Sequence, residues 1–388
     1  MKNIAIMGCT GSIGRQTIEV ISSLGPEYRV VAMAAGKDDK QMAGQIAKIN
    51  PEVAAIYNSD AAERLTNNLK PDSYDIRSGP EGQLAVATWP SADLVVMAQV
   101  GFSGLEPLIA ALKEGKMIAL ANKESLVAGG EIIERLGLLK QERILPIDSE
   151  HSAIRQCLES TSPGEINKIY LTASGGPFYG WKKADLKKVT PVMAIKHPNW
   201  KMGNKISVDS ATMINKGLEV MEAKWLFGLD LKQIEVVIHR QSVIHSMVEY
   251  IDGSILAQLG LPDMRLPIQY ALTYPERRKS GFERFNPIGR NLSFEEPDWI
   301  NFPGLELAYR AARMGGTMPT VFNGANEISV EQFLARKINF TDIPTVIDAA
   351  MREHTPIDKP EICDIIDADN WSRLKSAEFI ASLQRKVN

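Results

Sequence analysis

The spacing of hydrophobic positions along this chain changes twice and divides it into three parts. From residue 1 to about residue 145, short apolar runs alternate with amphipathic helical patterns. The apolar runs are residues 4–7, 30–35, 53–57, 94–98, 117–121 and 144–147. Alternation of this kind is typical of βαβ units, and it predicts a Rossmann-like, doubly wound parallel sheet.

A different pattern extends from about residue 150 to residue 275. The runs 169–172, 236–239, 243–250 and 254–259 predict strands, and Asp252-Gly253 between the last two predicts a hairpin turn. A polar-faced helix is predicted over residues 210–227. Together these elements predict an α+β domain with an antiparallel or mixed sheet.

The remaining part is predicted to be helical. Residues 274–297 are rich in Pro, Arg and Phe and show little periodicity, which predicts a linker. Apolar residues at helical spacing then predict helices over 305–313, 327–336 and 343–354, and hence a C-terminal helical bundle. The predicted class is α/β, with domains over residues 1–146 and 147–273, a linker over 274–299 and a helical domain over 300–388.

Composition places the chain among globular proteins. The chain has 388 residues, which is longer than a domain with a single hydrophobic core usually is. Of these residues 44% are hydrophobic and 23% are charged, and the formal net charge is −3. Nucleic acid is therefore not an expected partner. No apolar stretch has the length of a membrane span, and we expect no leader and a cytoplasmic protein. The chain has three cysteines, Cys9, Cys157 and Cys363. Because their number is odd and they are widely separated, the sequence predicts neither disulfide bonds nor a zinc site, and we expect a reducing compartment.

Residues 8–14 read Gly-Cys-Thr-Gly-Ser-Ile-Gly and fall between the first predicted strand and a predicted helix. Glycines at such a junction let the backbone approach a pyrophosphate, which then lies at the positive end of the helix. The alternative is a tight turn alone, but the position favours dinucleotide binding. After the second strand, Lys37 favours the 2′-phosphate of NADP, whereas Asp38 and Asp39 weaken that preference.

Carboxylates without His or Cys neighbours suggest a site for a hard cation. Asp148-Ser149-Glu150 follows a predicted strand, and Glu219 lies on the predicted helix 210–227. Oxygen ligands suit Mg²⁺ or Mn²⁺ and disfavour zinc. The alternative for the triplet is a helix cap.

The helix that carries Glu219 also carries groups that suit a phosphate. Ser210 falls at its predicted start, and Asn215 and Lys216 lie four and three residues before Glu219, on one face. A hydroxyl, an amide and an amine beside a metal-bound carboxylate would suit a sugar phosphate of about five carbons. The alternative is a surface Lys–Glu pair. Gly217 inside a helix indicates that something packs or binds closely there.

Three further segments are weaker candidates. Ser174-Gly175-Gly176 follows a strand and would present a hydroxyl and amides to an anion, although plain turns also have this composition. Lys123 follows another strand at the sheet edge where ligands bind, but would otherwise be a solvated charge. Residues 196–204, with His197 and Trp200, have the composition of a lid, the alternative being a buried anchor Trp.

Taken in order, these motifs closely resemble those of the 1-deoxy-D-xylulose 5-phosphate reductoisomerase family. The motifs are residues 8–14, 35–37, 121–125, 148–153, 172–178, 197–203 and 207–219. Each is modest alone, but their number and order are specific, and the resemblance runs from the first strand to the C-terminal helices.

The resemblance implies an NADPH- and metal-dependent enzyme of the methylerythritol phosphate route to isoprenoids, which rearranges and reduces 1-deoxy-D-xylulose 5-phosphate to 2-C-methyl-D-erythritol 4-phosphate. It implies that Asp148, Glu150 and Glu219 hold Mg²⁺ or Mn²⁺, which stabilises enolate-like charge. Other implied substrate contacts come from Lys123, Ser149, Ser174, His197, Trp200, Met202, Ser210, Asn215 and Lys216, with Trp200 and Met202 on the closing loop. Implied cofactor contacts come from Thr10, Gly11, Ser12, Ile13, Gly36, Lys37, Asp38, Asn122, Glu124 and Gly203.

Two positions depart from the family pattern. Asp38 stands where Asn is expected, and Arg240 where Pro is expected. Lys37 is then expected to recognise the 2′-phosphate while Asp38 faces solvent. The resemblance also implies a homodimer. A metal-assisted sugar phosphate dehydrogenase without rearrangement and a non-catalytic NADPH sensor are the alternative functions.

Overall fold

The computed structural model describes residues 1–69, 74–140, 142–159, 161–200 and 202–387. They form two compact units: residues 1–125, 137–152 and 263–283 make unit 1, and residues 126–136, 153–262 and 284–388 make unit 2. Among the described residues, no helix is both long and apolar enough to cross a membrane.

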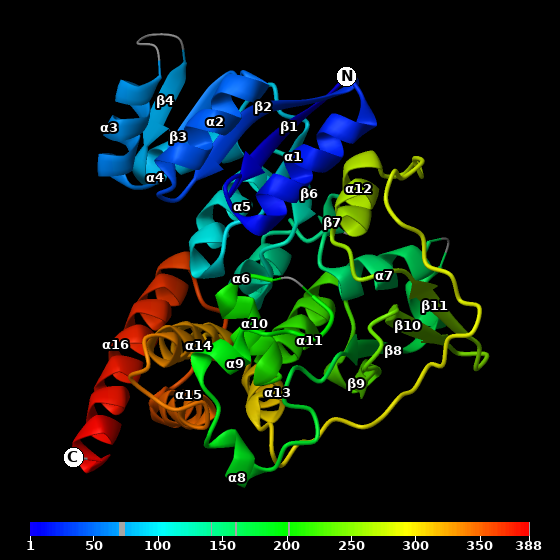
Figure 1. The fold of residues 1–388 in the computed structure, drawn as a ribbon, viewed down its shortest axis with the longest axis vertical. Helices are drawn as coiled ribbons and strands as arrows, with labels where there is room; N and C mark the ends of the chain where they lie inside the picture. Colours follow the sequence, from blue (N-terminus) through cyan, green and yellow to red (C-terminus); the bar gives the residue numbers. More distant parts are fainter. Residues whose placement is uncertain (70–73, 141, 160, 201, 388) are drawn as a thin grey trace. The chain divides into compact units, whose positions relative to one another are not determined.

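Unit 1 is built on a seven-stranded sheet in which every pairing is parallel. The spatial order is β4-β3-β2-β1-β5-β6-β7 (Figure 1). The strands are β1 (Lys2–Met7), β2 (Tyr28–Ala35), β3 (Val53–Ile56), β4 (Asp75–Ser78), β5 (Leu94–Met97), β6 (Met117–Leu120) and β7 (Ile144–Pro146). The order reverses between β1 and β5, which is where ligands of such sheets bind.

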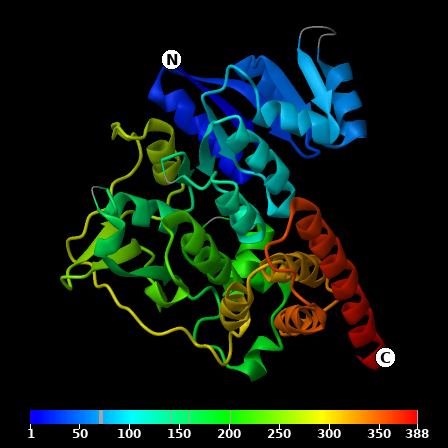
Figure 2. The same ribbon diagram turned by 180° about the vertical axis from the view of Figure 1, so that it is seen from behind.

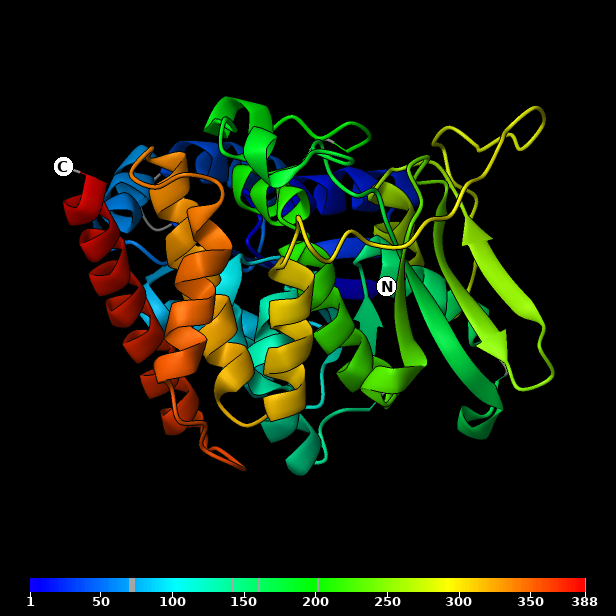
Figure 3. The ribbon, with the colours of Figure 1, turned by 90° about the horizontal axis from the view of Figure 1, so that it is seen from below.

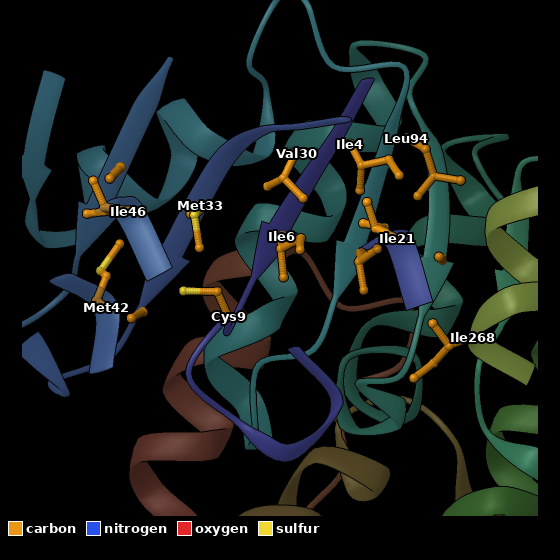
Figure 4. Close-up of a cluster of buried hydrophobic side chains, with 14 of the residues drawn as sticks. Ile4, Ile6, Cys9, Ile21, Val30, Met33, Met42, Ile46, Leu94 and Ile268 are labelled. Carbon is orange, nitrogen blue, oxygen red and sulfur yellow. The ribbon is translucent and has the colours of Figure 1, made fainter. Parts of the chain in front are cut away.

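Helices cover this sheet. They are α1 (Ser12–Leu24), α2 (Asp39–Ile49), α3 (Ser59–Asn68), α4 (Gly79–Ala87), α5 (Leu105–Lys113) and α12 (Arg265–Thr273). Residues of α1, α2, α3 and α12 share one buried cluster with Ile4, Ile6 and Met33 of the sheet (Figure 4). The helices α4 and α5 contact the sheet outside this cluster (Figure 2). The doubly wound fold is thereby confirmed.

Two helices continue from unit 1 into unit 2, namely α6 (Lys123–Arg135) and α7 (Ser149–Cys157). The sheet of unit 2 has the order β11-β10-β8-β9, and only β8 and β9 are parallel neighbours. Its strands are β8 (Ile166–Ala173), β9 (Ile234–Ile238), β10 (Ile244–Tyr250) and β11 (Ile255–Leu259). The prediction of an antiparallel or mixed sheet is confirmed.

The helices of unit 2 include the predicted C-terminal bundle (Figure 3). They are α8 (Lys183–Leu186), α9 (Pro191–Ala194), α10 (Asn204–Ala211), α11 (Ile214–Phe227), α13 (Gly304–Met314), α14 (Met318–Leu334), α15 (Asp342–Glu353) and α16 (Ile362–Val387). Between α12 and α13 the chain forms no helix or strand, apart from an isolated bridge of Glu295 to Ile238.

The structure corrects two predicted elements and adds a strand that was not predicted. The single helix over 210–227 is wrong, because Met213 adopts a left-handed conformation with φ 62° and separates α10 from α11. Ser210 therefore lies near the end of α10 and not at a helix start. The helix predicted over 327–336 begins earlier, at Met318, and the polar edge strand β4 was not predicted.

Gly217 permits close packing of α11 against α13. A Cβ atom at this position would overlap the Cβ of Ala308, which is fully buried. The packing interpretation of this helical glycine is confirmed.

We expect Gly217→Ala to destabilise the protein by about 1–3 kcal/mol, despite the better helix propensity of Ala, because the added methyl overpacks this contact. The thermal midpoint measures it. In the background of Ala308→Gly, which removes the opposing methyl, the same substitution should be neutral or stabilising. Equal destabilisation in both backgrounds would contradict the packing argument.

Candidate functional site

The loop between β1 and α1 is shaped by its glycines. Gly8 has φ 85°, and a Cβ atom on it would overlap the carbonyl of Ala98, while one on Gly14 would overlap the carbonyl of Gly8. The helix α1 begins at Ser12, and its cap residue Gly11 supplies no side-chain oxygen. The first amides of α1 are thus not covered by a side-chain cap, as an anion at the positive helix end requires.

Helix α2 holds this loop from the side. Gln41 donates to the carbonyl of Thr10 at 3.2 Å, and Gln45 donates to the carbonyl of Cys9 at 2.9 Å. Asp38 caps α2 by accepting the Gln41 amide at 3.0 Å, while Lys37 is exposed. The carboxylate of Asp38, where the family pattern has Asn, therefore caps the start of α2.

The side chain of Asn122 stabilises the loop after β5 by hydrogen bonds. Its side-chain amide donates to the carbonyls of Gln99 and Gly101, both at 2.9 Å, and to the carboxylate of Glu124 at 3.2 Å. Its oxygen accepts from Ser125. Both Asn122 and Glu124 are buried at the edge where β5 and β6 end.

Unit 1 also carries Asp148, which lies directly before α7. One oxygen of Asp148 accepts the Lys123 ammonium at 2.5 Å, and the other accepts the Glu150 amide at 3.4 Å. Lys123 is 5% exposed and Asp148 11% exposed. Asp148 thus caps α7 through one oxygen, as the cap alternative predicts, while its other oxygen pairs with Lys123.

Asp148 is held as a carboxylate. Burial by itself raises the pKa of Asp148, but the charges of Lys123 and His151 outweigh burial and hold this pKa well below its usual range. His151 Nδ1 lies 3.6 Å from Asp148, an i,i+3 contact not predicted from the sequence. Beside it, the Ser149 hydroxyl donates to Glu150 at 2.5 Å.

Glu219 lies in unit 2, on α11. Lys216 and Asn215 each donate to a different oxygen of Glu219. The Lys216 and Glu219 side chains are only 4% and 1% exposed, so the alternative of a surface pair is wrong. A buried carboxylate of this kind requires such partners, because desolvation of an unpaired charge is costly.

The Ser174 loop follows β8 in the same unit. Gly175 and Gly176 have φ 73° and 69°, and a Cβ atom on Gly176 would lie 2.8 Å from the carbonyl oxygen of Ser210. Glycine at position 176 thus brings the Ser174 loop against the end of α10. Ser174 and Ser210, which are far apart in sequence, are assembled on neighbouring segments.

The protonation of His197 follows from its hydrogen bonds. Its Nδ1 accepts the amides of Asn199 and Trp200 at 3.2 and 3.0 Å, so the proton of the neutral ring is on Nε2. Nε2 lies 2.9 Å from Ser174 Oγ, to which the Gly176 amide also donates at 3.1 Å. Both contacts use lone pairs of Ser174, so its own proton can be donated to an anion. Burial, assisted by the charge of Arg240, lowers the pKa of His197 to about 4.

The predicted lid segment 196–204 joins these groups to the sheet. Asn199 donates to the carbonyl of Arg240 and to Ser242 Oγ, both at 2.8 Å, and the Trp200 ring lies 5.9 Å from the ring of His245. Met202 is half-buried, and Gly203 is the exposed N-cap of α10. Lys201 lies outside the described residues.

Arg240 was not predicted as a site residue. Its guanidinium donates to the carbonyls of Ser174 and Gly176. The sequence contained no local signal for this role, because Arg240 follows β9 whereas its partners follow β8, and only the parallel pairing of the two strands brings them to one edge.

The arrangement offers two chemical capabilities. Unit 2 carries hydroxyl, imidazole, amide and ammonium donors of the kinds that bind a phosphate, on Ser174, His197, Ser210, Asn215 and Lys216, and of these Ser174 contacts His197. Asp148 and Glu150 in unit 1 and Glu219 in unit 2 present oxygen atoms, the donors that Mg²⁺ and Mn²⁺ prefer.

Comparison with known families gives three matches along the chain. The model of 1-deoxy-D-xylulose 5-phosphate reductoisomerase matches residues 4–130. The model of the C-terminal domain of that enzyme matches residues 144–227, and a second C-terminal domain model, of DXP reductoisomerase, matches residues 259–375.

Relatives that align with nearly the whole chain have the same name as these family models. The 1-deoxy-D-xylulose 5-phosphate reductoisomerase of Pelotomaculum thermopropionicum is 51% identical, with 99% of this chain and 100% of the relative covered. That of Desulfitobacterium hafniense strain DCB-2 is 49% identical, with 98% and 100% covered.

Solved structures agree. A DOX-P reductoisomerase in complex with NADPH, fosmidomycin and magnesium superposes with a TM-score of 0.92 at 39% identity, covering 99% of both chains. The reductoisomerase from Zymomonas mobilis in complex with NADPH gives a TM-score of 0.90 at 39% identity, covering 98% of this chain and 99% of that one. With half of its residues identical to such relatives from end to end, this chain belongs to the 1-deoxy-D-xylulose 5-phosphate reductoisomerase family.

Proposed function

We propose that this chain catalyses the NADPH- and divalent-metal-dependent conversion of 1-deoxy-D-xylulose 5-phosphate to 2-C-methyl-D-erythritol 4-phosphate, a step of non-mevalonate isoprenoid biosynthesis. The observation that carries the proposal is 51% identity over 99% of the chain to a relative of that name. The glycine loop, the buried carboxylates and the phosphate-type donors supply the groups that this chemistry needs.

Residues 1–146 are the proposed cofactor-binding part. The uncapped start of α1 suits the pyrophosphate, with Thr10, Gly11, Ser12 and Ile13 around it. Lys37, next to Gly36, is the cation for a 2′-phosphate, and Asp38 fixes the start of α2 beside it. Asn122 and Glu124 hold the loop that ends β5, and Gly203 lies in the lid segment. Bound NADPH supplies the hydride for the reduction.

Residues 147–273 are the proposed metal- and substrate-binding part. The proposed metal ligands are Asp148, Glu150 and Glu219, and Asp148 is already ionised because of Lys123 and His151. A cation held there would act as a Lewis acid and would stabilise enolate-like charge. The Lys123 ammonium and the Ser149 hydroxyl hold protons that they can donate to the reacting oxygens.

The substrate phosphate is proposed to bind in unit 2. Ser174 and His197 form one side, and Ser210, Asn215 and Lys216 form the other. Because the neutral His197 points its Nε2 proton at Ser174, it orients the hydroxyl without adding charge. Trp200 and Met202 of the lid segment would cover the carbon chain and exclude water.

The first test is NADPH oxidation at 340 nm with 1-deoxy-D-xylulose 5-phosphate and Mg²⁺ or Mn²⁺. We expect metal-dependent turnover to the branched methylerythritol phosphate, and Glu219→Gln should lower kcat/KM at least about a hundredfold because it removes a charged ligand. NADPH binding should be retained in this variant.

The matched control is Glu235→Gln, which neutralises an exposed glutamate of the same unit paired with Lys168. It should leave turnover unchanged. An unbranched product would support the dehydrogenase alternative, and cofactor binding without turnover under either metal would support the sensor.

His197 should remain neutral in the folded protein from pH 8 to about pH 5, because burial lowers its pKa to about 4. Its imidazole resonances in an NMR titration measure this. In urea the midpoint should return to about 6.5. Since the unfolded chain takes up the proton first, folding stability contributed at this site is full above about pH 6.5 and is lost as the pH falls toward 4. A folded-state midpoint near 6.5 would contradict the lowering of this pKa by burial.

We further propose a cytoplasmic homodimer. All three cysteines are free thiols, which suits a reducing compartment. The edge strand β11 and its turn carry exposed apolar side chains, with Ile251 70%, Ile255 50% and Leu256 52% exposed. An uncovered apolar edge strand is a ready surface for self-association.

Leu256→Glu should therefore convert a dimer to a monomer in light scattering coupled to gel filtration, because a charge on the interface is costly to desolvate. Leu374→Glu on α16 is the control, since Leu374 is 68% exposed outside this surface. An unchanged dimer in Leu256→Glu, or a monomeric wild type, would remove β11 as the interface.

A further inference from the structure

Arg240 is a cation built into the loops around Ser174. It follows β9 and is half-buried. Its guanidinium donates to the carbonyl oxygens of Ser174 and Gly176, the latter at 2.9 Å. These two carbonyls belong to the residues before and after Gly175, so one side chain holds the turn by hydrogen bonds on both sides of this glycine.

The backbone conformation that Arg240 stabilises would rarely persist in a loop without such a contact. Gly175 and Gly176 both have left-handed backbone angles, and glycine gains much conformational freedom when it is released. A planar guanidinium with several donors in fixed geometry can hold two carbonyls at once, which Lys cannot do in the same way. Arg240 therefore fixes where the Ser174 hydroxyl and the Gly176 amide point.

The same residue is also tied to the lid segment. The carbonyl of Arg240 accepts from Asn199 at 2.8 Å, two residues from His197. The Ser174 loop is thus held by the side chain of Arg240, and the His197 segment by its backbone. These two segments meet at the Ser174–His197 contact of 2.9 Å.

The guanidinium also packs against an aromatic ring. It lies 4.8 Å from the ring centroid of Tyr179, whose hydroxyl donates to Glu295. Glu295 is bridged to Ile238 at the end of β9. No salt bridge among the described residues involves Arg240, so its positive charge is not cancelled by a paired carboxylate.

We propose that Arg240 is a positioning residue for the substrate phosphate: it fixes the Ser174–Gly176 turn in the phosphate-receiving conformation, adds unpaired positive charge beside it, and thereby sets KM. The identity of the substrate rests on the proposed function. The proline expected at this position from the family pattern has no side-chain donor, so this chain holds the turn by a contact of its own.

The test compares Arg240→Met and Arg240→Lys with the wild type, using the full-length enzyme with NADPH and Mg²⁺. Arg240→Met removes the donors and the charge at similar length, whereas Arg240→Lys keeps the charge. The control is Lys168→Met, which removes a cation that lies 5.6 Å from the ring of Tyr170 on the same sheet but does not contact the Ser174 turn.

We expect Arg240→Met to raise KM for the sugar phosphate about tenfold, equivalent to about 1.4 kcal/mol, with kcat changed less than about twofold. The inhibition constant of inorganic phosphate, used as a competitor, should rise by the same factor. Arg240→Lys should fall between Met and wild type, and NADPH affinity should be the same in all variants.

Three results would overturn the proposal: an unchanged KM and phosphate inhibition constant in Arg240→Met, a loss confined to kcat, or an equal KM change in Lys168→Met. If Arg240→Met does not fold, as judged by NADPH binding, Arg240→Lys decides, since a wild-type KM there shows that the guanidinium geometry is not needed and a raised KM shows that it is.

Failure of the proposed function can be separated from failure of this inference. If the wild type does not turn over the sugar phosphate, calorimetric binding of inorganic phosphate to wild type and Arg240→Met still measures the role of Arg240. A tenfold loss of phosphate affinity would then retain the positioning role, and equal affinities would remove it.

Discussion

Two of the proposed metal ligands are carboxylates buried in charged pairs. Asp148 and Glu219 are almost without contact with solvent, and each has a lysine ammonium on one of its oxygens. Removing one partner from such a pair leaves an uncompensated buried charge, which is far more costly than the pair itself. Lys123 and Lys216 therefore have a folding role as well as their proposed contacts with substrate, and neither lysine can be exchanged without affecting the carboxylate beside it.

Parallel strands explain where the functional groups come from. The glycine loop follows β1, Asn122 and Lys123 follow β6, and Asp148 follows β7. In unit 2 the Ser174 turn and Arg240 follow the parallel neighbours β8 and β9. In each sheet, the carboxyl ends of adjacent parallel strands deliver residues that are distant in sequence to one edge. Local contacts then set the geometry: the Asp38 side chain caps α2, and Gly176 allows its loop to pack against the end of α10.

The sequence predicted the features that local patterns determine. The βαβ rhythm, the glycine loop and the Asp-Ser-Glu triplet after a strand were visible because they combine periodicity with specific side-chain chemistry. The break at Met213 was not, because a left-handed methionine has no local signal and is stabilised by tertiary packing. There, Gly304 at the start of α13 brings the chain against the carbonyl of Thr212 and the side chain of Ile214. Strand β4 was missed because its residues are polar and lie at an exposed edge, and Arg240 because its partners come from another strand.

The break at Met213 has an electrostatic consequence. In one uninterrupted helix, Asn215 and Lys216 would lie in the interior, away from the charged ends of the helix dipole. Because α11 starts anew at Ile214, these residues lie in its first turn, at the end of the helix where the dipole presents partial positive charge. A single left-handed residue thus places the favourable pole of a fourteen-residue helix beside the Lys216 ammonium. The polypeptide backbone itself then adds positive potential to that of the lysine side chain at this end of the helix.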